Sequence, residues 1–137
     1  MTQTNVKSGP IILSSADDLT AKNGYLVKIK NDSGKAKFAL PDATTDLALF
    51  VVVDGGDTTT AALPISPERD VRLKLSGTCN PGDVLVLAVP DGTVDGAVRA
   101  LPADPGTYRG IAIAEEVGAD GQDILARPAM IGYITQT

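Results

Sequence analysis

Short apolar stretches, separated by turns rich in glycine, proline, asparagine and aspartate, recur along the whole chain. Residues 71–75 alternate strictly, with Val71, Leu73 and Leu75 on one face and charged residues on the other. This period of two is that of a half-buried strand. The turn signals return every 8–12 residues. The pattern predicts nine short strands: 11–13, 25–30, 35–40, 47–53, 69–75, 84–89, 94–101, 108–114 and 124–134.

Four details refine this prediction. The run of seven apolar residues at 47–53 indicates a central strand buried on both faces, and residues 58–65 form an extended segment. The turn 80–83, Asn-Pro-Gly-Asp, combines a fixed φ at proline with the freedom of glycine and leads into the strand 84–89. A single helical turn is expected at 114–117. The fold class is therefore all-β, a small β-barrel or sandwich with little helix.

The chain of 137 residues suits one domain. Residues 1–10 are polar and without periodicity, so we expect an extended N-terminal arm, followed by a single β domain over residues 11–137. The N-terminus lacks the basic and apolar regions of a signal peptide, and no apolar run is long enough to span a membrane. We expect synthesis in a cytoplasm and no membrane partner.

Composition argues against several function classes. The net charge is −5 and the 12 basic residues are scattered, which disfavours nucleic-acid binding. Only two Phe, three Tyr and no Trp are present, too few for a platform on which sugars or bases stack. No histidine occurs, so triads that need one are excluded. Cys79 is the one cysteine and is interpreted as an inert, partly buried thiol.

Acidic residues offer two weaker candidates for chemistry. The loop 91–96 has aspartates at its first and fifth positions and glycine at its sixth, as calcium loops do, but Pro102 stands where the bidentate glutamate is needed. Glu115 and Glu116 are adjacent, and adjacent side chains diverge on a strand or a helix. We therefore interpret the loop 91–96 as an ordinary turn, and Glu115 and Glu116 as a solvated pair of side chains. We therefore expect no metal, no cofactor and no enzyme, with catalysis by carboxylates alone as a minor alternative.

Four segments of the C-terminal half together resemble a known family. They are Pro81–Leu87, Asp91–Val94, Gly110–Glu116 and the stretch from Asp123 to Gly132. This succession is similar to that in the capsid cement, or head decoration, proteins of tailed bacteriophages, and a looser similarity extends back to residue 19. The chain departs from the family pattern at Pro128 and in the segment 64–67.

The resemblance implies a non-enzymatic virion protein that binds the outer surface of the major capsid protein shell and stabilises it. It also implies a homotrimer at threefold or quasi-threefold positions. An arm of ten residues spans roughly 30 Å when extended and is suited to reach a neighbour. We therefore expect capsid or inter-subunit contacts at Val6, Pro10, Ile11, Ile12 and Leu13. The alternative is a soluble β-barrel module, monomeric and with an apolar cavity for a small ligand or peptide.

Overall fold

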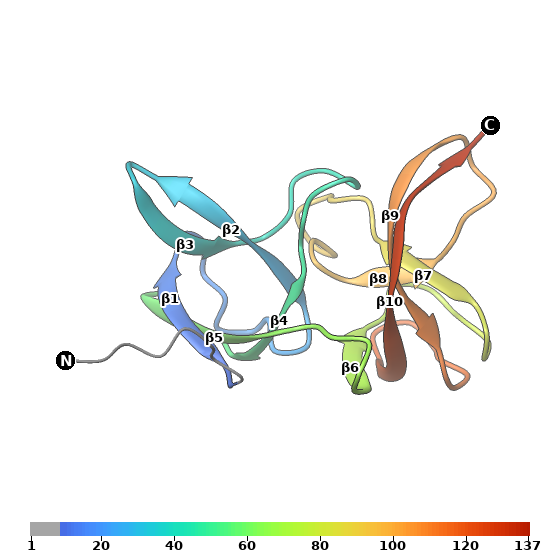
Figure 1. Cartoon of the computed structure of the whole chain (residues 1–137), viewed down its shortest axis with the longest axis horizontal. Coiled ribbons are helices and arrows are strands. Elements are labelled where there is room, and N and C mark those ends of the chain that lie inside the picture. Colours follow the sequence, from blue (N-terminus) through green and yellow to red (C-terminus); the bar gives the residue numbers. More distant parts are fainter. Residues whose placement is uncertain (1–8) are drawn as a thin grey trace.

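The computed structural model describes residues 9–137, the side chain of Met130 excepted, and these residues form two five-stranded sheets (Figure 1). The first sheet comprises β1 (Ile11–Ser15), β2 (Leu26–Asp32), β3 (Lys35–Ala39), β4 (Phe50–Asp54) and β5 (Thr59–Pro64). The second comprises β6 (Val71–Lys74), β7 (Val84–Leu87), β8 (Val98–Ala100), β9 (Gly106–Ala114) and β10 (Asp123–Gln136). The all-β prediction is confirmed, with ten strands in place of about nine and no helix between residues 9 and 137.

The first sheet closes into a barrel in the order β1-β3-β2-β4-β5. β1 pairs antiparallel with β5 and parallel with β3, so both of its edges are occupied. Alternate side chains point inward, because successive residues of a strand face opposite sides. Phe38, fully buried, is the largest of them and contacts the ring of Phe50 at 5.5 Å between centroids. Closure removes the open edges that invite pairing with other chains.

The second sheet has the order β6-β10-β9-β7-β8. A parallel bridge joins Leu75, just after β6, to Val98 of β8, and the Ser76 amide donates to the Val98 carbonyl at 2.8 Å. The chain just after β6 therefore contacts β8, the strand at the opposite end of the sheet. This contact protects β8, which is short and would otherwise present an open edge.

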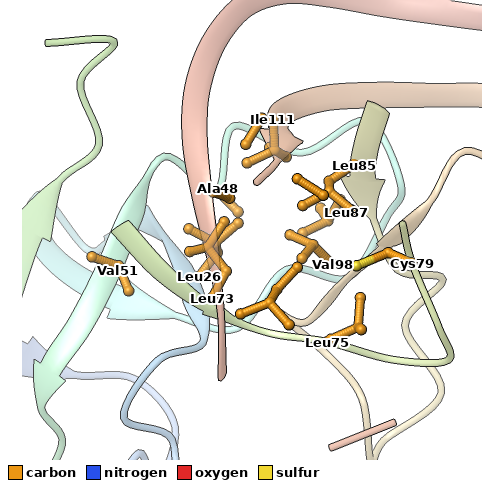
Figure 2. Close-up of a cluster of buried hydrophobic side chains, with 14 residues drawn as sticks. Leu26, Ala48, Val51, Leu73, Leu75, Cys79, Leu85, Leu87, Val98 and Ile111 are labelled. Atoms are coloured by element: carbon orange, nitrogen blue, oxygen red, sulfur yellow. The ribbon is translucent and has the colours of Figure 1, made fainter. Parts of the chain in front are cut away.

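One hydrophobic cluster joins the two sheets. Leu26, Ala48 and Val51, from the half of the chain that builds the barrel, belong to the same buried cluster as side chains of β6–β10 (Figure 2). Two backbone hydrogen bonds add to the junction: the Leu26 amide donates to the Gly96 carbonyl at 2.8 Å, and the Lys74 amide to the Gly24 carbonyl at 3.0 Å. Burial of this apolar surface, at about 25 cal/mol per Å², is the main force holding the sheets together.

Two turns have the chemistry that the sequence predicts. In the turn 80–83 the Asp83 carboxylate accepts from the Asn80 amide at 2.9 Å, and Gly82 has φ +89°. In the loop 91–96 each aspartate accepts hydrogen bonds from backbone amides of the loop itself. The expected strand 94–101 is consequently shorter and begins at Val98, because these bonds hold residues 91–97 in turns.

Two local predictions are wrong. The apolar run 47–53 is not a strand throughout, since β4 begins at Phe50, and it is not buried on both faces, because Leu47 and Val53 are exposed. Residues 114–117 form no helical turn. There the Glu115 amide donates to the Leu125 carbonyl at 3.0 Å, and the Glu116 carboxylate accepts from the Leu125 amide at 2.9 Å. These bonds continue the pairing towards β10 instead.

Candidate binding surface

An apolar groove of about 360 Å³ lies between the two sheets. Its walls come from four separate segments of the chain. They are Leu47 and Leu49 before β4, Ile65 and Pro67 after β5, residues 109–111 of β9, and Pro128, Ala129, Ile131 and Gly132 of β10. Apolar clefts of this size, with few polar groups, are the usual form of a binding site. This groove is therefore the candidate functional site.

A bulge in β10 shapes one wall of the groove. The register between β9 and β10 shifts between Pro128 and Gly132, where Pro128 has no amide hydrogen to donate and Gly132 has φ +78°. The extra residues fold over β9. A Cβ on Gly110 would lie only 2.7 Å from the Cβ of Ile131, which is too close for two carbon atoms. Glycine at position 110 thus permits the bulge.

The opposite wall is positioned by the loop 40–49. The Arg109 amide of β9 donates to the Thr44 carbonyl at 3.0 Å, and the Thr44 hydroxyl donates to the Thr107 carbonyl at 2.8 Å. These bonds hold the loop against the edge of β9 and leave Leu47 at the mouth of the groove with 59% of its surface exposed.

The polar part of the groove's rim consists of the Arg109 side chain and the neighbouring ring of Tyr133. The Arg109 guanidinium lies 4.4 Å from the centroid of the Tyr133 ring, a cation–π arrangement. Its Nε donates to the Thr45 carbonyl at 3.4 Å, as does the Tyr133 hydroxyl at 3.3 Å. Tyr133 is 58% exposed. The rim therefore offers a positive charge and an exposed ring beside an apolar floor.

Lys28 of β2 holds the same loop electrostatically, through Asp42 and Asp46. Its ammonium group lies 2.8 Å from Asp46 and 2.9 Å from Asp42. Burial opposes ionisation of Asp46, but the hydrogen bond from Lys28, the Asp42 amide and the Lys28 charge outweigh it and lower the pKa from 3.8 to about 2. For Lys28, burial is likewise outweighed by the two carboxylates, so its pKa is raised.

We expect this triad to make stability depend on acid pH. Because the pKa of Asp46 is depressed in the folded chain, its stabilisation is complete above pH 3.8 and is lost as the pH falls towards 2. Asp46→Asn is expected to lower the free energy of unfolding by about 2 kcal/mol at pH 6 and by almost nothing at pH 2. Denaturant unfolding at both pH values measures this.

Asp42→Asn is the matched control, because Asp42 also contacts Lys28 but its side chain is 82% exposed, against 21% for Asp46. We expect it to cost less than about 0.5 kcal/mol. An Asp46→Asn deficit of equal size at pH 6 and pH 2 would contradict the ionic origin of the effect.

The other candidate groups are engaged in local structure. Hydrogen bonds from Val94 and Thr93 lower the pKa of Asp91. A hydrogen bond with Asp70 raises the pKa of Glu115, and burial raises the pKa of the Cys79 thiol. Within residues 9–137 no cluster of three potential metal ligands is present, and the loop 91–96 is closed on its own amides.

The structure places the predicted contact residues on and before β1. Val6 lies outside the described residues. Ile11 and Leu13 are half-buried against the barrel cluster around Phe38, whereas Pro10 is exposed and Ile12 points outward with 70% of its surface exposed. Ile12 is thus the one strand residue of this set that is free to meet a partner, and the contact role of the set stays a prediction.

Sequence reasoning missed the groove. Its residues are distributed over positions 47 to 132, and no single segment indicates a cleft. The available signals were Pro128 and Gly132 inside an expected strand, since both residues mark bulges. The exposed Leu47 was hidden within an apolar run.

No family model matches this chain, and no curated protein matches it significantly. No helix long and apolar enough to cross a membrane occurs in the described part of the chain.

Proposed function

We propose that this chain is a structural binding protein that attaches to the outer surface of a tailed-phage capsid shell and stabilises it. In this proposal its partner is the major capsid protein, its role is not enzymatic, and it acts as a homotrimer at threefold or quasi-threefold positions. Identification of the shell as partner depends on the sequence resemblance of residues 81–132 to cement proteins.

The observation that carries the binding role is the apolar groove with its exposed rim. Leu47 and Tyr133 stand in solvent beside an apolar floor, an arrangement typical of surfaces that bind a partner. The framework around it consists of paired strands joined by tight turns, several of which contain glycine. Three such surfaces in a trimer would turn weak single contacts into tight attachment.

Co-sedimentation with expanded, undecorated shells tests the proposal. We expect the full chain to pellet with expanded shells and to remain in solution with unexpanded ones. We expect removal of residues 1–10 to weaken binding, because the arm would reach a neighbouring subunit, and we expect Leu47→Glu to weaken it through the groove. Val117→Glu, at an equally exposed apolar position that does not line the groove, is the matched control. Failure of the full chain to bind any cognate shell would overturn the proposal.

The groove also favours a second function, a soluble module that binds a small ligand or peptide away from any capsid. A groove of about 360 Å³ holds a few aliphatic side chains or a small molecule. Native mass measurement separates the two: a trimer favours the capsid protein, and a monomer at micromolar concentration that binds ligands favours the module.

A further inference from the structure

The ends of β9 and β10 form a two-stranded ribbon that projects beyond β7 and β8 (Figure 1). In it residues 132–136 pair with residues 106–110. One side of the ribbon is covered, because the loop 40–49 bonds to the edge of β9 through Thr44. The other side is the outer edge of β10. There β6 pairs only with residues 123–126, so in the described chain no strand pairs with the outer edge of residues 132–136.

The backbone of this edge faces outward at two residues. The amide of Arg109 points away from β10, since it donates to Thr44 on the other side. Tyr133 and Arg109, which lie opposite each other, therefore form a non-hydrogen-bonded pair. In an antiparallel ladder the amide and carbonyl of Tyr133 then point to the outer edge of β10. The same holds two residues on, at Thr135. Within residues 9–137 neither amide has an acceptor.

Beyond the bulge of β10, the edge lacks two of the usual forms of protection, charges and proline. Strand edges are normally guarded by charges, by proline or by a covering loop. Residues 131–136, Ile-Gly-Tyr-Ile-Thr-Gln, contain no charge and no proline. Nearer the barrel, Arg127 contacts Asp70 and the Pro67 carbonyl, so the edge is covered up to that point. The open part begins at the end of the groove's β10 wall, which runs from Pro128 to Gly132.

The charge beside the edge indicates what kind of segment fits. Arg109 is at the rim of the groove and, among the described residues, makes no ion pair. A strand laid along β10 in line with β6 would have one end at the apolar groove. Its side chains on the Tyr133 face would lie beside the Tyr133 ring, and the Arg109 guanidinium is stacked on that ring from the β9 side. A carboxylate there would complete the polar contacts that the rim leaves open.

We propose that the outer edge of β10 binds an extended segment of another protein by strand addition, with an aliphatic side chain in the groove and a carboxylate at Arg109. Main-chain hydrogen bonds to Tyr133 and Thr135 would supply affinity, and the groove and Arg109 would supply selectivity. This inference goes beyond the proposed function, because it concerns the mode of recognition and requires no capsid.

A second copy of the chain suits the site less well. Two copies paired edge to edge through residues 131–136 would bring no carboxylate to Arg109, because that segment contains none. A heterologous segment satisfies the edge, the groove and the charge together.

Selection from a library of displayed random peptides against the full chain tests this inference. We expect the selected peptides to carry alternating aliphatic residues and an acidic residue. Thr135→Pro removes one outward amide and is expected to weaken these peptides at least about tenfold. Thr135→Ala also removes the hydroxyl but keeps the amide, and we expect its affinity for these peptides to stay within about threefold of that of the wild type. Arg109→Glu leaves the backbone intact and is expected to weaken binding about tenfold.

Hydrogen exchange supplies a readout that does not depend on the variants. The amides of Tyr133 and Thr135 should exchange rapidly in the free chain and become protected by a selected peptide. Peptides unaffected by both Thr135→Pro and Arg109→Glu would overturn the inference. So would a wild-type dimer that Thr135→Pro dissociates, since the edge would then belong to a second copy.

Discussion

Replacement of Gly96 by alanine is expected to destabilise the fold by roughly 3–5 kcal/mol, one of the two largest effects we predict. Gly96 has φ +89°, where a side chain costs about 1–3 kcal/mol in backbone strain. A Cβ at this position would also overlap the carbonyl oxygen of Leu26. Relieving that overlap disturbs the hydrogen bond from Leu26 to Gly96, one of those that join the two sheets.

Gly92→Ala is the matched control for this prediction. Gly92 has nearly the same φ, +91°, but a Cβ there would meet nothing within 4 Å. We expect it to cost about 1–2 kcal/mol, the backbone strain alone. Equal loss of unfolding free energy in the two variants, measured by denaturant titration, would contradict the close approach of Gly96 to Leu26.

Phe38→Ala should destabilise the chain by about 3–5 kcal/mol, because it empties the centre of the barrel. Phe38 is fully buried and is the largest side chain of its cluster. We also expect the loss to reach the second sheet, since Leu26 and Val51 of the barrel strands belong to the cluster that includes Leu73 and Ile111. Both sheets should then unfold in one transition.

Hydrogen exchange on Phe38→Ala measures this coupling. We expect the protection of amides in β2 and in β9 to fall together. Phe38→Leu, which keeps an apolar side chain of intermediate size, should show the same pattern with a smaller loss. If amides of β9 keep wild-type protection while those of β2 lose it, the two sheets are independent units and the shared cluster does not couple them.

The fold class could be predicted from the sequence because it depends on patterns within short stretches of neighbouring residues. The alternation at 71–75 gave β6 its correct faces, with Leu73 buried and Arg72 exposed. The turn at 80–83 likewise predicted the start of β7. Both signals depend on a few neighbouring residues, and contacts with distant segments did not alter the local structure that these signals predict.

The groove and the division into two sheets could not be predicted in this way. An unbroken apolar run such as 47–53 has no period, so it does not show that its first residues form a loop and that Leu47 faces solvent. Strand order depends on contacts between distant segments, as in the bridge from Leu75 to Val98. The helical turn expected at 114–117 failed for the same reason, since Glu116 is held by Leu125.

Electron cryomicroscopy of expanded shells mixed with the full chain tests the proposed capsid role most directly. We expect added density on the outer surface only, as threefold-symmetric lobes at the threefold or quasi-threefold positions, into which three copies of the two-sheet structure fit. Shells that show no added density at saturating protein, or density confined to the inner surface, would contradict it.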